Sequence, residues 1–237
     1  MLLIFLIGII GNFIPFSLIS WSEQYIKSNT AGLLLSVAPI ITLILSHFFT
    51  KDDKFTLTKF ISISVGLIGV LLIFGYNPFN ILTTDKNEYF IPKLAIILSA
   101  FGYVISAILA YNLKHINTFT LTTYVTIFAA FVSIPFFIYY EISNPSNFNY
   151  KTIFPVVYLG IFPTAIAFLI RFHLISKAGP IFLSYVAYLI PIFAIFWGYI
   201  FLKETISVNT SLGVMMILIG VYIGRNSNVQ NSLIDHK

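Results

Sequence analysis

Residues 183–203 read LSYVAYLIPIFAIFWGYIFLK, an apolar run that carries a central proline, Pro191, and no charge before Lys203. A run of this kind is typical of a helix that crosses the hydrocarbon core of a bilayer, which takes about 20 apolar residues. The same design recurs at residues 31–51, AGLLLSVAPIITLILSHFFTK, around Pro39. These two stretches predict that the chain is a membrane protein.

The composition of the whole chain agrees with this prediction. Of its 237 residues, 58% are apolar and 9% are charged, whereas soluble proteins have roughly 45–50% and about 25%. Apolar runs occupy residues 2–20, 31–49, 58–76, 92–112, 118–140, 152–172, 180–202 and 208–224. We therefore predict an all-α integral membrane protein with eight transmembrane helices and no room for a soluble domain.

Charge and residue usage exclude several other classes of protein. The 13 Lys and Arg residues outnumber the 8 Asp and Glu residues, but they stand singly or in short clusters between apolar runs. No basic stripe is therefore available to a nucleic-acid backbone. The chain has no cysteine, which excludes disulfides and thiolate metal sites. We expect the lipid bilayer and a small molecule as partners, with no cofactor and no nucleic acid.

The distribution of basic residues predicts the orientation in the membrane. With eight helices both termini lie on one side, and eight of the 13 basic residues fall on that side. They are Lys51, Lys54, Lys59, Lys114, Arg171, Lys177, Arg225 and Lys237. Because cytoplasmic loops are enriched in Lys and Arg, we predict a multi-pass protein of the cell membrane with both termini in the cytoplasm.

The sequence also contains an internal repeat. A shift of 152 residues superimposes the first two apolar runs on the sixth and seventh without a gap, and it pairs Gly8 with Gly160 and Pro39 with Pro191. After a one-residue slip the third and last runs also agree. Because five helices, an odd number, separate equivalent positions, the two copies must be inserted upside down relative to each other. Secondary transporters are commonly built from such inverted repeats.

The first copy lacks counterparts of the fourth and fifth apolar runs. Shifted back by 152 residues, Pro92 falls about 60 residues before Met1, so two helices have no partner. We therefore divide the chain into a partial first repeat of three helices (1–76), a connecting loop (77–91), a second repeat of five helices (92–224) and a polar cytoplasmic tail (225–237). A complete protein of this design has ten spans.

Short motifs in both copies resemble the EamA repeat of the drug/metabolite transporter superfamily. In the first copy they are the run 31–45 with Pro39, Lys51-Asp52, and a helix with Gly66 and Gly69; in the second they are Pro191, Leu202-Lys203-Glu204 and Gly213 to Gly220. The resemblance covers nearly the whole chain and implies an inverted 5+5 repeat without its first two helices. It also implies that the apolar runs 2–20, 31–49, 92–112, 152–172 and 180–202 surround the substrate cavity.

Small and polar residues form stripes on these helices. At helical spacing Ser184, Tyr188 and Pro191 share one face, and the shift of 152 residues places Ser36 and Pro39 on the matching face of the first copy. In a bilayer such a stripe turns away from lipid, toward a neighbouring helix or a wet cavity. Each proline also frees a backbone carbonyl, which is tolerated at membrane depth beside a cavity or another polar group.

The predicted substrate-binding residues are Asn12, Ser36, Pro39, Ser99, Tyr103, Ser106, Thr164, Ser184, Tyr188 and Pro191. For Asn12, an interhelical hydrogen bond and a ligand contact both fit the sequence. All eight acids lie in connections, at helix ends or in the tail, so coupling to protons or sodium through a buried acid is not expected. Arg171 is expected at the cytoplasmic end of the run 152–172, either as an interfacial anchor or as a contact to an anionic group of the substrate.

Together these features predict transport of a small neutral or zwitterionic metabolite, similar to an amino acid, by alternating access between the two repeats. Catalysis is not expected, because the sequence contains no HxxxH or ExxH cluster. The alternative is a non-transporting membrane subunit or receptor, including a truncated transporter. A chain without two of its helices also leaves assembly with a second chain, such as a homo-oligomer, open.

Overall fold

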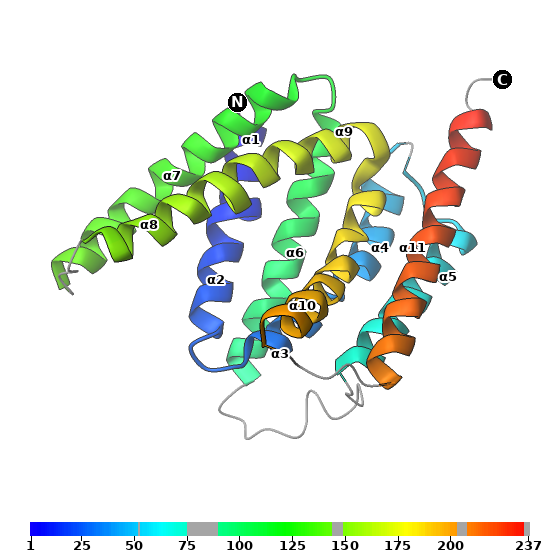
Figure 1. Ribbon diagram of the computed structural model, residues 1–237. Helices are drawn as coiled ribbons and strands as arrows, with labels where there is room; N and C mark the ends of the chain where they lie inside the picture. Colours follow the sequence, from blue (N-terminus) through cyan, green and yellow to red (C-terminus); the bar gives the residue numbers. More distant parts are fainter. Residues whose placement is uncertain (52, 75–89, 144–148, 203–207, 235–237) are drawn as a thin grey trace.

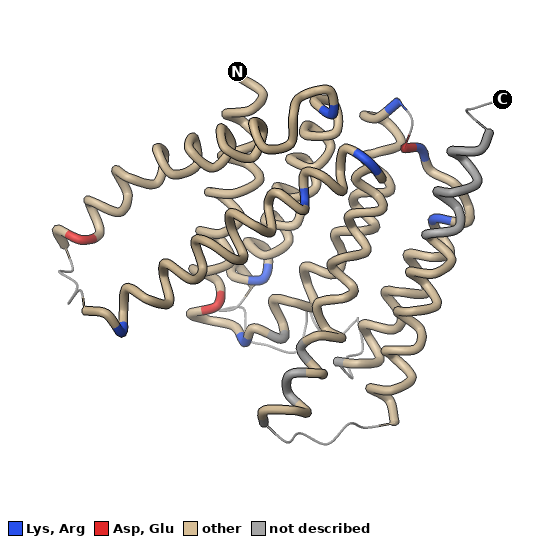
Figure 2. Tube along the Cα trace, turned by 45° about the horizontal axis from the view of Figure 1, so that its top comes forward, with Lys and Arg blue, Asp and Glu red and all other residues tan. Residues whose placement is uncertain are grey.

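The computed structural model describes residues 1–51, 53–74, 90–143, 149–202 and 208–234, and within these ranges the chain is helical with no strand. Five helical stretches are long and apolar enough to cross a membrane. They are Leu2–Ser22, Thr30–Phe49, Phe90–Asn112, Thr118–Ser143 and Tyr150–Ser184. Charged residues lie mostly at helix ends and in connections (Figure 2), so the described part of the chain has the build of a multi-pass membrane protein.

In chain order the elements are α1 (Leu2–Gly8), the π-helical segment η1 (Ile9–Phe13), α2 (Ile14–Ser22), α3 (Ser28–Leu35), α4 (Ala38–Phe49), α5 (Leu57–Phe74), α6 (Phe90–Asn112), α7 (Thr118–Ser143), α8 (Tyr150–Leu159), the π-helical segment η3 (Gly160–Ile166), α9 (Ala167–Ser184), α10 (Val186–Leu202) and α11 (Val208–Ile234). In Figure 1, α7 and α8 lie at one edge of the bundle and the pair α5 and α11 lies at the other. The start of α1 and the end of α11 lie at the same end of the bundle.

The helix at the C-terminus is longer than its apolar run. The sequence predicts a helix over residues 208–224 and a polar tail from Arg225, but α11 continues through Ile234. Residues 225–234 contain no Pro or Gly, so neither of the two strongest helix breakers ends the helix where its apolar pattern stops. Most of the predicted loop 77–91, together with Asp52, Lys203 and Glu204, lies outside the described residues.

Two helices contain π-helical segments at positions that the sequence repeat relates. The segment η1 covers Ile9–Phe13, and a shift of 152 residues carries it to 161–165, inside η3 (Gly160–Ile166). A π-helical turn breaks the regular hydrogen-bond ladder of an α-helix and is frequent at functional sites. A proline accompanies each segment, since Pro15 follows η1 and Pro163 lies within η3.

Glycines bring α5 and α11 into close contact. A Cβ atom added to Gly69 would lie 2.6 Å from the carbonyl oxygen of Gly213, and one added to Gly220 would lie 2.7 Å from the carbonyl oxygen of Ser62. Residue numbers therefore rise along one helix as they fall along the other, and the two helices are antiparallel. Small residues at such contacts let backbones approach closely, which gives van der Waals attraction that lipid does not replace.

A buried ion pair in the segment after α4 is also hydrogen-bonded to the kink in α9. Lys59 Nζ donates to Asp53 Oδ1 at 2.7 Å, and both side chains are buried. The second oxygen, Asp53 Oδ2, accepts a hydrogen bond from the backbone N–H of Ile181 at 2.9 Å. Ile181 follows Gly179, whose φ of +85° interrupts α9. Asp53 thus acts as a helix cap from a distant part of the chain, satisfying a donor that the kink leaves without an intrahelical partner.

The contact between α5 and α11 predicts an unequal response to two alanine substitutions. Gly69→Ala places a Cβ against the α11 backbone, and we expect it to lower the free energy of unfolding by about 1–3 kcal/mol, as overpacking does elsewhere. Gly32→Ala should have little effect, because a Cβ at Gly32 meets no atom within 4 Å. Thermal melts of the purified protein in detergent measure both, and equal losses from the two variants would contradict the close contact.

The ion pair between Asp53 and Lys59 predicts that a second substitution restores part of the stability lost through the first. Asp53→Asn leaves the Lys59 ammonium buried without its carboxylate, and we expect a loss of about 3 kcal/mol or more. Adding Lys59→Met removes that buried charge and should recover part of the loss. A double-mutant cycle from the same melts checks this, with exposed Lys54→Met as the control. Additive losses would show that the two side chains do not act as a pair.

Candidate functional site

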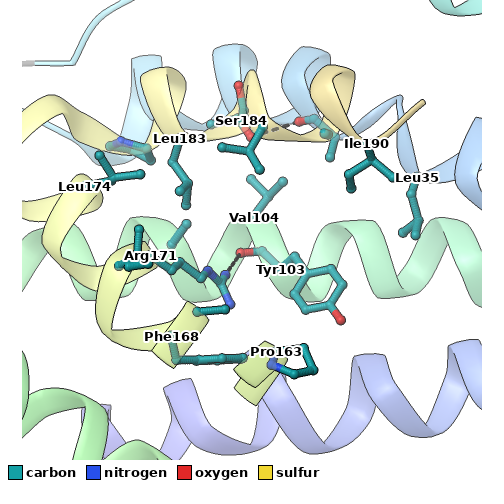
Figure 3. Close-up of a pocket in the computed structure, with 18 of the residues that line it drawn as sticks. Leu35, Tyr103, Val104, Pro163, Phe168, Arg171, Leu174, Leu183, Ser184 and Ile190 are labelled. Atoms are coloured by element: carbon teal, nitrogen blue, oxygen red, sulfur yellow. Dashed lines mark hydrogen bonds between the residues drawn. The ribbon is translucent and has the colours of Figure 1, made fainter. Parts of the chain in front are cut away.

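A cavity of about 430 Å³ lies among α2, α3, α4, α6, η3, α9 and α10. Its wall is mostly apolar, with Thr42, Tyr103, Arg171 and Ser184 as the residues that carry polar side chains. The other lining residues are Phe16, Leu35, Ala38, Val104, Ala107, Pro163, Ala167, Phe168, Ile170, Leu174, Pro180, Leu183, Val186, Ala187 and Ile190. These elements belong to the five helices that the family resemblance implies around a substrate cavity. Figure 3 shows the cavity with Arg171 beside Tyr103 and Phe168.

Arg171 is held by uncharged oxygen atoms of two other helices. Its Nη2 donates to the backbone oxygen of Tyr103 at 3.0 Å and to Ser106 Oγ at 2.8 Å, and Nη1 donates to the backbone oxygen of Gly11 at 3.5 Å. Among the described residues no carboxylate contacts the guanidinium. The cation is therefore fixed in place without being neutralised.

The backbone around Gly11 explains why an acceptor is available there. Pro15 has no N–H group, so the carbonyl oxygen four residues earlier, that of Gly11, has no α-helical donor. Arg171 fills this position from α9. Gly11 must also be small, because a Cβ there would collide with the side chain of Ser106 on α6. One glycine thus permits both the close approach of α6 and the contact to Arg171.

Aromatic rings surround the same guanidinium. The Cζ atom of Arg171 lies 5.3 Å from the ring centroid of Phe168, 5.4 Å from that of Tyr103 and 5.8 Å from that of Phe172. Cations within about 6 Å of such rings are attracted by their quadrupoles, and more strongly where water is excluded. The rings therefore stabilise a charge that the apolar wall would otherwise disfavour.

The position of Arg171 corrects the expectation from the sequence. We expected it at the cytoplasmic end of a helix spanning 152–172, but the helical stretch continues to the kink at Gly179. Arg171 consequently lies within the stretch and reaches Gly11, near the middle of Leu2–Ser22. The dipeptide Gly179-Pro180 was the signal for the true helix end. Without Arg171, the basic residues on the side assigned to the cytoplasm fall from eight to seven.

The structure divides the ten predicted binding residues into three groups. Tyr103 and Ser184 line the cavity, and Ser106 holds Arg171 at its wall. Asn12 and Thr164 line a separate cavity of about 740 Å³ between η1, α2, α7 and η3. The side chains of Ser36, Ser99 and Tyr188 donate to the backbone oxygens of Leu33, Ala95 and Ile63 among packed helices. Pro39 and Pro191 are buried and line neither cavity.

The two central prolines differ in their local structure. Pro39 stands at the start of α4, just after a break at Ser36–Val37, whereas Pro191 lies inside α10 and the nearest break is at Tyr185. Most of the apolar lining was not predicted, because an apolar residue in a cavity wall is indistinguishable in sequence from one that faces lipid. Thr42 was also not predicted, although it follows Pro39 by three residues and so lies at helical spacing from it. Within the described ranges no group of three or more His, Cys, Asp or Glu side chains is placed to hold a metal ion.

The packing predicts which positions a thiol reagent reaches. Because the chain has no cysteine, each substitution introduces a single thiol. Ser184→Cys lines the cavity and should react with a water-soluble methanethiosulfonate. Ser99→Cys should react far more slowly, since Ser99 is fully buried on α6. Labelling followed by mass spectrometry measures both rates, and comparable rates would show that the cavity is not selectively accessible.

Comparison with known proteins gives a consistent family assignment. A model of the EamA-like transporter family matches residues 1–75 and 91–224. The "Uncharacterized transporter YoaV" of Bacillus subtilis is 23% identical over 207 residues, 87% of this chain and 69% of that protein. An "Uncharacterized transporter" of Archaeoglobus fulgidus is 27% identical over 220 residues, 93% of this chain and 76% of that protein. A solved crystal structure has the same fold, with a TM-score of 0.75 at 18% identity over 93% of this chain and 74% of its own.

Proposed function

The chain belongs to the EamA-like transporter family, and we propose that it carries a small amino-acid-like metabolite across the membrane by alternating access. The relatives reported above are named as transporters, which gives transport as the general function. The proposal adds to this the class of substrate and alternating access as the mechanism of transport. It places the substrate in the cavity around Arg171.

The composition of that cavity carries the proposal. Its volume of about 430 Å³ falls within the range of roughly 300–1,000 Å³ that small-molecule sites have. A mostly apolar wall with a few fixed polar groups is also typical of such sites. An amino-acid-like solute matches this wall, because its side chain suits the apolar residues while its polar end suits Thr42, Ser184 and Arg171.

Three features support alternating access between inverted repeats. The sequence repeats with a shift of 152 residues, and the π-helical segments η1 and η3 lie at positions that this shift relates. The antiparallel contact of α5 with α11 is the one that a two-fold axis in the membrane plane would produce. The cavity draws its wall from both parts, from α2, α3 and α4 in the first and from α6, η3, α9 and α10 in the second. Rocking of one repeat against the other would expose such a site to each side in turn.

We further propose the cell membrane as the location, with both termini in the cytoplasm. The start of α1 and the end of α11 lie at one end of the bundle (Figure 1), which supports a common side for the two. Seven basic residues against five then favour the cytoplasm for that side.

The proposal predicts that filling the cavity stops transport. Ala187 lines the cavity, and Ala187→Trp should reduce uptake to background by occupying the space of the substrate. Val156→Trp adds a similar bulk to an exposed position of α8 and should leave uptake near the wild-type rate. Counterflow of radiolabelled L-amino acids into proteoliposomes measures both variants.

Two results would contradict this function. Wild-type protein that moves none of the amino acids would favour a non-transporting membrane subunit or receptor. Uptake that Ala187→Trp leaves unchanged would place the substrate path elsewhere in the molecule.

A further inference from the structure

We propose that Arg171 is the binding site for a carboxylate, so that the anionic group of the substrate, and not its amine, is what the cavity recognises. This inference rests on the proposed function for its location, the cavity of about 430 Å³, but it makes a narrower chemical statement. The predicted ligand is an anion with an apolar body, with or without an amino group.

The guanidinium retains donors that the protein does not use. Arginine has five N–H groups, and the described residues accept three hydrogen bonds from Arg171, two at Nη2 and one at Nη1. The Nε–H group and one Nη1–H group therefore have no partner among the described residues. Arg171 lines the cavity, so these groups are available to a ligand there.

The charge of Arg171 is also unbalanced. Buried charges in proteins are ordinarily paired, because an isolated ion in apolar surroundings is costly. Lys59 follows that rule, since it pairs with Asp53 at 2.7 Å. Among the described residues, Arg171 has backbone oxygens, a hydroxyl group and aromatic rings around it, and no carboxylate. A bound anion would supply the missing counter-charge through charge-assisted hydrogen bonds, which are the stronger kind.

The lining also determines which part of a zwitterion is not recognised. None of the described residues that line the cavity is Asp or Glu, so none of them offers a carboxylate to an ammonium group. The positions around Arg171 are instead apolar, among them Phe168, Leu174 and Leu183 (Figure 3). An acid that lacks the amine should therefore bind about as well as the amino acid, whereas an amide that lacks the carboxylate should not bind.

Ligand-induced thermal stabilisation of the purified full-length chain tests this without depending on transport. The probes are L-phenylalanine, 3-phenylpropionate and L-phenylalaninamide, which share one apolar body and differ in charge. We expect the first two to raise the melting temperature of the wild-type protein in a saturable way, and the amide to leave it unchanged. A ligand that binds the native state alone raises the midpoint by mass action.

Substitutions at Arg171 provide the second arm of the test. Arg171→Met should weaken the apparent affinity for 3-phenylpropionate about tenfold or more, the effect expected for losing hydrogen bonds from a charged donor. Arg171→Lys keeps the charge but loses the planar fork, and an intermediate affinity is expected. The matched control is Lys177→Met, which removes the same charge from an exposed position on the same helix. Its affinity should equal that of the wild type.

The outcomes separate this inference from the proposed function. Stabilisation by the amide equal to that by the acid, or no stabilisation by either acid, would overturn the carboxylate site. Amino-acid counterflow without selective stabilisation by acids would leave transport standing and refute the role of Arg171. Selective stabilisation by acids without counterflow of any amino acid would support the site and refute amino-acid transport. If Arg171→Met does not fold, the comparison of acid with amide on wild-type protein still decides whether the cavity recognises a carboxylate.

Discussion

In a bilayer every backbone polar group must find its hydrogen-bond partner within the protein. The helices of this chain depart from regular α-helix at Pro15 and at Gly179, and each departure leaves one backbone group without a partner in its own helix. Pro15 leaves the carbonyl oxygen of Gly11 without its α-helical donor, and Arg171 donates to it from α9. The kink at Gly179 leaves the N–H group of Ile181 without an intrahelical acceptor, and Asp53 accepts from it. Both departures are thus satisfied by side chains from distant parts of the sequence.

These two contacts also help to form the wall of the cavity. The contact to Gly11 draws α9 toward α2 and α6 and fixes a cation in the wall of the cavity. The contact to Ile181 fixes the point at which the chain turns from the first half of α9 to the second, whose residues Pro180, Leu183 and Ser184 form another part of the wall. Irregular backbone in η3 and at Gly179-Pro180 therefore lies at the cavity, as expected because such backbone is tolerated in a bilayer where the protein covers it.

Lys59 and Arg171 show how differently one kind of group can be used. Lys59 has a carboxylate partner and connects the α4–α5 segment to the kink, which is a structural role. Within the part of the chain that the structure describes, Arg171 has neutral partners and retains unused donors, which suits a group that meets a ligand. Arginine is the better choice for the second role, because its guanidinium is weakly hydrated and its planar donors stay charged when buried. Three aromatic rings within 6 Å of the guanidinium lower the cost of holding that charge while no ligand is bound.

The sequence by itself determined the membrane class, the approximate positions of the apolar helices and the family, because hydropathy and the spacing of residues such as Gly8 and Pro39 are one-dimensional properties. It also predicted that Tyr103, Ser106 and Ser184 face away from lipid, since small polar residues at helical spacing mark the face that avoids it. It did not separate these from Ser36, Ser99 and Tyr188, which share the pattern but bond to carbonyl oxygens between packed helices. Only the tertiary structure decided that division, and it alone placed Arg171 beside Gly11 and Tyr103. The physical reason is that a residue's depth and partners depend on where its helix ends and which helices cross it, and at Arg171 both were set by contacts with residues 65 or more positions away.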